Sequence, residues 1–167
     1  MTLKEALDFL EQHQPMPADD TLDDDLIGRY EEVRGFLEQN PEELAVPLLL
    51  NSFGEGDGFG VYQRVEDVLV KLPNDVVLPH LLEALRSPIR SVRSWSAELA
   101  SAFPNPILLP ALEELLAIGE SDERSAAITA LEQMGGRDAL LALQRHHERE
   151  RDPEIVRFLD GAIRRLS

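Results

Sequence analysis

The chain has 167 residues and a formal charge of −16, from 32 acidic and 16 basic side chains, and it contains no cysteine. This length suits a single domain with a substantial core, and the lack of cysteine excludes disulfides, thiolate metal sites and a cysteine nucleophile. The acidic balance argues against nucleic acid as a ligand, because phosphate backbones bind to clustered Lys and Arg.

Apolar residues recur at helical spacing along almost the whole chain, and short stretches with Pro, Gly, Asn or Asp separate them. The pattern predicts an all-α protein. We expect helices at residues 2–13, 22–39, 41–52, 60–72, 75–87, 89–103, 106–118, 121–134, 137–150 and 153–166. The first helix carries charges among its apolar positions, unlike a secretory leader, and no stretch approaches the roughly 18 apolar residues of a membrane span. These features predict a cytoplasmic protein that contacts no membrane.

Residues 1–52 are the most acidic part of the chain, with 13 acidic and 3 basic side chains, against 6 and 7 in residues 136–167. The asymmetry either maintains solubility or steers a basic partner towards the protein. The run at residues 19–25 has the composition of a metal cluster, but Asp and Thr are also favoured at helix starts. We therefore expect helix capping there, with divalent-ion binding or contact with a partner's Lys or Arg as alternatives.

A glycine-rich segment follows at residues 51–60, with glycines at positions 54, 56, 58 and 60 just before a predicted helix. Such a segment can present backbone N–H groups to an anion. No Gly-Lys-Ser/Thr motif follows, however, and Glu55 and Asp57 place negative charge where phosphate would bind. Asp57 also lacks the spaced partners of a calcium loop. Of three interpretations of this segment, we favour a structural turn. The alternatives, in decreasing order, are a protein-binding loop and an ion or nucleotide site.

From residue 41 onwards the sequence repeats. Pro47, Pro79 and Pro110 follow one another at spacings of 32 and 31 residues, each inside an apolar stretch. Interior prolines remove a hydrogen bond, so we expect them to bend the first helix of each pair. A repeat of this length indicates stacked helix pairs that bury their apolar stripes against their neighbours.

The repeat resembles the HEAT-repeat family, in particular the short bacterial HEAT-like repeats of phycobilin lyase subunits. The resemblance lies in the Leu-Pro-x-Leu pattern of the first helices and in a second-helix motif at Val92, Arg93, Ser96 and Ala97. It covers residues 41–167, about four repeats, and leaves residues 1–40 as a helical cap within a single domain. It departs from the family pattern at Glu123 and at the glycine-rich insertion. The resemblance implies a right-handed α-α superhelix, a solenoid of antiparallel helix pairs whose second helices line a concave binding face.

The sequence contains no constellation that indicates catalysis. Serines lie outside Gly-x-Ser-x-Gly contexts, and paired acids are too common to nominate a general acid and base. The histidines, at positions 13, 80, 146 and 147, lack the spacing of a zinc site, and adjacent His146 and His147 are expected to point to different sides of a surface helix. We expect no catalytic residue, no metal and no cofactor.

We expect a partner-binding surface on the second helices. In the helix at 89–103, the side chains predicted to face the core are Val92, Ser96, Leu99 and Phe103. Ala97 then points away from the core and Trp95 lies near the boundary, where it either joins the core or contacts the partner. Arg93 could instead pair with acids of a neighbouring repeat. The candidates for partner contact are Asp57, Tyr62, Glu66, Asp67, Arg90, Arg93, Trp95, Glu123 and Arg124.

These observations favour a non-catalytic protein-binding module, a monomer or weak homodimer, whose partner has a basic surface. Within that class, the resemblance and the charge favour a bacterial immunity protein that occludes a basic toxin domain. The alternatives are a general adaptor or assembly protein and a bilin-lyase-like subunit, for which nine aromatic residues are few. A HEAT-like DNA glycosylase would need a basic groove, which this charge disfavours.

Overall fold

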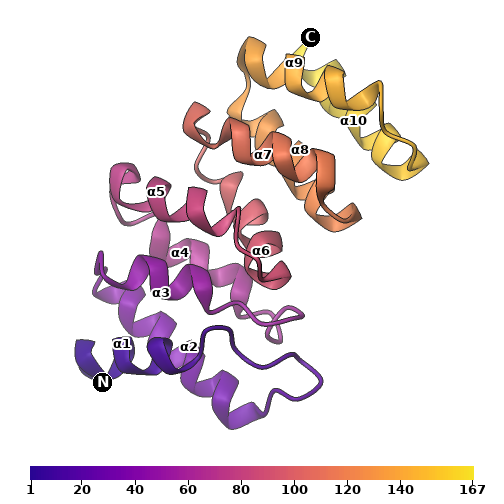
Figure 1. Cartoon of the computed structure of the whole chain (residues 1–167). Helices are drawn as coiled ribbons and strands as arrows, with labels where there is room; N and C mark the ends of the chain where they lie inside the picture. The colour runs from indigo at the N-terminus through magenta and orange to yellow at the C-terminus, as the bar shows by residue number, and fades with distance from the viewer. The chain divides into compact units, whose positions relative to one another are not determined.

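The protein is entirely helical in a computed structural model that describes residues 1–167, which confirms the predicted all-α class. The chain divides into two compact units, Met1–Trp95 and Ser96–Ser167, which we call unit 1 and unit 2 (Figure 1). None of the helices combines the length and the apolar character needed to cross a bilayer.

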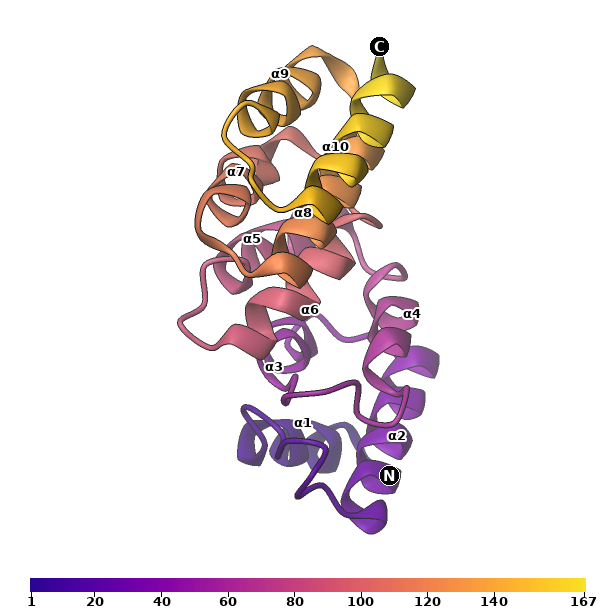
Figure 2. The same cartoon turned by 90° about the vertical axis from the view of Figure 1, so that its right-hand side faces the viewer.

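Unit 1 consists of two layers of helices (Figure 2). One layer holds α1 (Leu3–Gln12), α3 (Ala45–Asn51) and α5 (Asn74–Ala84), in which α3 contacts both of the others. The second layer holds α2 (Asp24–Gln39) and α4 (Glu66–Leu69), which a 3-10 helix, η1 (Tyr62–Val65), precedes. The first half of α6 (Arg90–Ala100) also belongs to this unit.

Capping residues set the starts of the first two helices. Thr2 and Glu5 form a capping box on α1, and the Asp23 side chain accepts a hydrogen bond from the N–H of Leu26 (2.7 Å) at the start of α2. Asp24 and Asp25 occupy the first turn of α2, where negative charge is favourable. The expected capping by the acidic run is therefore confirmed at Asp23, with Asp24 and Asp25 in the first turn, whereas the carboxylate of Asp19 binds elsewhere and does not cap α2.

Two glutamates that a buried arginine holds join α2 to the segment around α4. The side chain of Arg34 is 3% exposed and pairs with Glu31 and Glu38 at 2.7 Å each. Glu31 also binds Arg64, and Glu38 binds Lys71 at 3.2 Å. Because each glutamate has a partner on both segments, this chain of charges ties the second layer of unit 1 together.

Unit 2 consists of two antiparallel helix pairs, α7 (Leu109–Ile118) with α8 (Ser121–Met134) and α9 (Gly136–His147) with α10 (Pro153–Leu166), after a 3-10 helix, η2 (Pro106–Leu108). The second helices, α8 and α10, contact each other, and so do α7 and α9. Apolar residues of each helix, such as Ile155, Leu159 and Ala162 of α10, form the core between the pairs. The bounds predicted for α8 and α10 are confirmed.

The helix predicted at 60–72 is wrong in type and length. The structure has η1 followed by a single turn, α4, which ends at Leu69. Four β-branched valines lie between residues 61 and 70, and they lose side-chain freedom in a helix. Pro73 then disfavours helical geometry at Leu72.

The interior helical position predicted for the three prolines is confirmed at one of them. Pro79 lies inside α5, where it removes an interior hydrogen bond. Pro47 and Pro110 lie in the first turns of α3 and α7, where backbone N–H groups have no partner within the helix. The expectation of a bend at Pro47 and Pro110 is therefore wrong, because both helices begin later than predicted.

Candidate functional site

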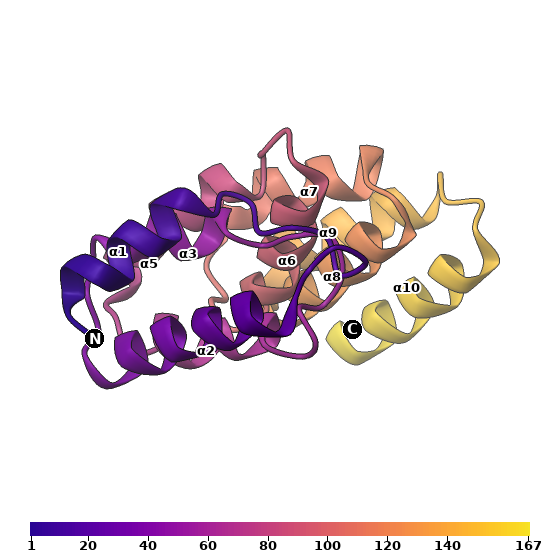
Figure 3. The ribbon, with the colours of Figure 1, turned by 90° about the horizontal axis from the view of Figure 1, so that it is seen from below.

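Two loops of unit 1 lie side by side (Figure 3): residues 13–23, between α1 and α2, and residues 52–61, between α3 and η1. The backbone N–H of Met16 donates to the carbonyl of Ser52, and that of Asp19 donates to the carbonyl of Glu55, both at 2.9 Å. We call this pair of segments the double loop. Its backbone bonds fasten the long first loop to the glycine-rich segment.

The carboxylate of Asp19 occupies the backbone donors of the glycine-rich segment. Its Oδ2 accepts from the N–H of Asp57 (2.9 Å) and its Oδ1 accepts from the N–H of Gly58 (3.0 Å). Successive N–H groups that converge on one acceptor form a nest of the kind that binds anions. Here a side chain of the protein takes the place that a phosphate would need, which argues against an anion site in this segment. The structure contains no group of His, Asp and Glu side chains that could hold a metal ion.

Two glycines allow the chain to approach this closely. Gly56 and Gly58 have φ values of +106° and +57°. A Cβ on Gly56 would lie 2.2 Å from Cγ of Asp19, and one on Gly58 would lie 2.8 Å from the ring of Tyr62. Both the backbone conformation and the available space therefore require glycine.

The side chain of Trp95, on α6, supports the double loop. Its Nε1–H donates to the carbonyl of Gly56 (3.0 Å), and its ring stacks on Phe53 with centroids 5.6 Å apart. The edge of the Tyr62 ring completes the cluster at 5.8 Å. Trp95 is half-buried, as expected for a residue at the boundary of the core. Any contact that it makes with a partner would depend on the position of this loop.

Phe59 is a candidate that the sequence reasoning missed. It is 57% exposed, and its φ of +52° is uncommon for a residue with a bulky side chain. Gly58 and Gly60 on either side also have positive φ. An exposed aromatic ring held in a costly conformation indicates a functional contact. In the sequence, the signal that could have identified Phe59 is its position as a single large apolar residue between two glycines.

The double loop, α2 and α4 each carry exposed carboxylates that have no ion pair. We call this set the acidic patch: Asp20, Asp24, Asp25, Asp57 and Asp67. The Asp19 bonds and the pair between Arg64 and Glu31 hold the three segments that carry it together. Unit 1 has 19 acidic and 8 basic side chains, a formal charge of −11, and each basic side chain has a bonding partner. The negative charge of the acidic patch is therefore not neutralised locally.

Two of the predicted partner contacts are wrong because the side chains are buried. Tyr62 is fully buried in the aromatic cluster. Glu123 is 1% exposed, and its carboxylate accepts from the N–H of Glu120 (2.9 Å) in the capping box of α8. Ala97, predicted to face away from the core, is also fully buried, whereas the core positions predicted for its helix are confirmed.

The remaining candidates lie at the surface or near it. Asp67 is exposed on α4, and Glu66 beside it is half-buried. Arg90 lies 3.5 Å from Glu55 of the double loop, and Arg93 donates to the carbonyl of Ser87 (2.9 Å). Arg124 lies in unit 2 and donates to the carbonyl of Gly119 (3.0 Å). The structure thus brings Arg90 and Trp95 against the double loop, which carries Asp57. Partner contact remains a prediction for the exposed candidates.

The adjacent histidines point to different sides, as predicted: His146 binds Glu150 (2.9 Å) and His147 binds Asp160 (2.8 Å). A surface position is wrong for His146, whose side chain is only 13% exposed. It lies in a pocket of unit 2 that the sequence did not indicate.

No protein-family model matches the sequence, and no curated protein matches it either.

Proposed function

We propose that the chain is a non-catalytic protein-binding module of the HEAT-like kind, and that the acidic patch and Phe59 contact a partner with a basic surface. The observation that carries this proposal is an exposed aromatic ring on the double loop of a unit that also exposes five carboxylates without ion pairs. Interface hot spots combine such an anchor with a polar rim.

The two parts of this surface have different physical roles. Unneutralised carboxylates attract a basic partner over several ångströms and accelerate its association, by about 10- to 1000-fold in steered complexes. Phe59 supplies apolar area, and full burial of such a side chain is worth about 1.5–3 kcal/mol. The charges therefore act mainly on the association rate, whereas the ring acts mainly on the dissociation rate.

A toxin domain with a cationic substrate cleft is the partner that we favour, which makes the protein an immunity protein. Carboxylates of the acidic patch would pair with the Lys and Arg that otherwise bind phosphate, and so occlude the cleft. A general adaptor would use the same surface on a partner without catalytic activity. The identity of the partner separates these two forms of the proposal.

The proposal includes a solenoid arrangement of the helix pairs. It is supported by the repeat spacing of residues 47, 79 and 110 and by the two antiparallel pairs of unit 2. Consecutive pairs of this kind bury their apolar stripes only against neighbours.

The test is affinity capture from the native cells with three baits: wild type, a patch variant and a matched control. The patch variant carries Asp20→Asn, Asp57→Asn and Asp67→Asn. The control carries Glu11→Gln, Glu43→Gln and Glu83→Gln, which are exposed carboxylates of the other layer of unit 1 or next to it. Each variant loses three negative charges, so a general effect of net charge affects both equally.

We expect one basic protein that wild type and the control retain at low salt, and that the patch variant and high salt release. Equal loss from both variants would show that net charge alone attracts the partner. Equal retention by all three baits would contradict a role for the acidic patch.

A further inference from the structure

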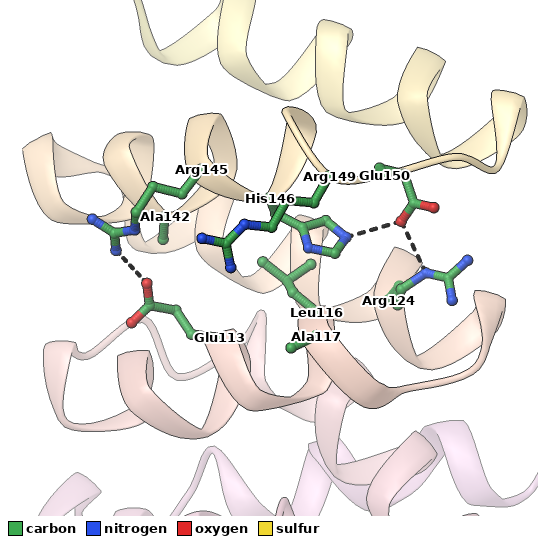
Figure 4. Close-up of a pocket in the computed structure, with 9 residues that line it drawn as sticks. All are labelled: Glu113, Leu116, Ala117, Arg124, Ala142, Arg145, His146, Arg149 and Glu150. Carbon is green, nitrogen blue, oxygen red and sulfur yellow. Dashed lines mark hydrogen bonds and ion pairs between the residues drawn. The ribbon is translucent and has the colours of Figure 1, made fainter.

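Unit 2 contains a pocket of about 420 Å³ between α7, the start of α8 and the end of α9 (Figure 4). Its volume lies within the range of small-ligand sites. The charged groups that line it are Arg124, Arg145, Arg149, Glu113 and Glu150, and the ring of His146 lies among them. Three guanidinium groups against two carboxylates give the pocket an excess of positive charge, in a chain whose formal charge is −16.

Both carboxylates of the pocket are engaged by groups of the protein. Glu113 binds Arg145 at one side. Glu150 is nearly buried: its Oε2 lies 2.9 Å from Nε2 of His146 and 3.1 Å from Nε of Arg124. Its Oε1 accepts from the backbone N–H groups of Arg151 and Asp152, each at 2.9 Å. Neither carboxylate forms an ion pair with Arg149.

Arg149 is the one charged group of the pocket whose side chain makes no hydrogen bond and no ion pair. The close-up shows its guanidinium over the pocket beside the ring of His146. Its backbone N–H donates to the carbonyl of His146 (2.9 Å), in the turn that ends α9. Arg137 and Arg164 are likewise exposed and unpaired, but they do not line this pocket. An unpaired guanidinium beside apolar walls can donate hydrogen bonds to an anion and so forms a binding site for one.

The rest of the lining indicates which anion fits. Leu116, Ala117 and Ala142 give the pocket an apolar wall that suits a short hydrocarbon chain. Glu113 and Glu150 repel a second negative charge, which disfavours a phosphate dianion. A single carboxylate balances the excess charge and matches the two parallel N–H donors of the guanidinium.

We propose that this pocket binds a monocarboxylate with a short apolar chain, through a bidentate interaction with Arg149. The ligand is either a free organic acid or the terminal carboxylate of a peptide. This site lies within unit 2 and is independent of the acidic patch.

The test is an NMR titration of the isotope-labelled full chain with four probes: butyrate, N-acetylleucine, N-acetylleucine amide and inorganic phosphate. We expect the two carboxylates to shift the backbone signals of Ala117 and Ala142, and the neutral amide and phosphate to shift them far less. Tighter binding of N-acetylleucine than of butyrate would identify a peptide terminus as the source, and the reverse order would identify a free acid.

Variants of two arginines make the assignment specific. Arg149→Gln is expected to weaken butyrate binding by about tenfold or more, because it removes a charge-assisted pair of hydrogen bonds. Arg149→Lys keeps the positive charge but loses the two parallel N–H donors, so its affinity for butyrate is expected to lie between those of wild type and Arg149→Gln. Arg137→Gln removes an exposed, unpaired charge from α9 outside the pocket, and this variant is expected to bind butyrate as wild type does. Unchanged binding in Arg149→Gln, or equal shifts with phosphate, would overturn the proposal.

Discussion

In unit 1, the same substitution of tyrosine by phenylalanine is expected to change stability in opposite directions at two neighbouring positions. Tyr30 and Tyr62 are both fully buried, with ring centroids 5.6 Å apart. The Tyr30 hydroxyl lies 2.7 Å from Oγ of Ser52, and the Ser52 hydroxyl donates to the carbonyl of Leu49 (2.7 Å). A serine has one hydroxyl proton, so Tyr30 must be the donor to Ser52. The Tyr62 hydroxyl, in contrast, is buried and makes no well-formed hydrogen bond, although the backbone of Gly54 lies close to it.

These contacts predict different effects of removing each hydroxyl. Tyr30→Phe breaks a buried hydrogen bond and leaves the Ser52 oxygen without its donor, so we expect unfolding to become easier by about 1–2 kcal/mol. Tyr62→Phe removes an unsatisfied polar group and keeps the ring contacts, so we expect no loss and a gain of up to about 1 kcal/mol. The two variants should therefore differ by about 1–3 kcal/mol, which is a large difference for one oxygen atom.

Urea unfolding followed by tryptophan fluorescence measures this difference directly. Trp95 is the single tryptophan, and its ring lies 5.8 Å from that of Tyr62, so the signal reports on unit 1. Equal slopes for both variants would show that only stability has changed. A loss for Tyr62→Phe as large as that for Tyr30→Phe would refute the reasoning. It would mean that the Tyr62 hydroxyl has a hydrogen bond, most simply with the backbone of Gly54, against which it lies.

Three further predictions concern the double loop and unit 2. Asp19→Ala removes a carboxylate that accepts two backbone hydrogen bonds and should destabilise unit 1 by about 2 kcal/mol in urea unfolding. A clearly smaller loss would argue against the view that Asp19 holds the two segments of the double loop together. Phe59→Asn suits a positive φ and should leave stability unchanged while the captured partner dissociates faster, so an unchanged dissociation rate would exclude Phe59 as an anchor. Although burial alone would raise the pKa of Glu150, the N–H groups of Asp152 and Arg151, the His146 ring and Arg124 hold it below its usual value of 4.5. The ionised Glu150 carboxylate therefore contributes fully to stability at neutral pH. This contribution is lost as the pH falls below about 4.5 and through the folded-state pKa. The difference in unfolding free energy between wild type and Glu150→Gln should shrink over that range.

The sequence predicts the helices well where start signals and apolar periodicity agree. For α10, Asp152 and Pro153 fix the start, and Ile155, Leu159 and Ala162 give one buried stripe. The helix predicted at 60–72 fails because valines satisfy the apolar pattern while they disfavour a long helix. Short 3-10 turns produce the same pattern over four residues, so periodicity cannot separate the two structures.

The sites are less predictable because they depend on which side chains pair across the fold. Tyr62 satisfies the composition of an interface residue, but its ring fills the core beneath the glycine-rich segment. Arg145 and Arg149 lie on neighbouring turns, and only the packing of α7 against α9 decides that Glu113 pairs with Arg145. Likewise, nothing in the order of residues indicates that Asp19 binds the N–H groups of a segment more than thirty residues away. Such contacts follow from the tertiary structure rather than from local spacing.

The central claim is that the acidic patch steers a basic partner, and the most direct measurement is the association rate constant of the captured partner as a function of ionic strength. We expect wild type and the Glu11/Glu43/Glu83 control to associate fast at low salt, with a rate that falls steeply as salt is added. The Asp20/Asp57/Asp67 variant should associate more slowly and show a shallower dependence. Identical rates and slopes for all three proteins would contradict the claim.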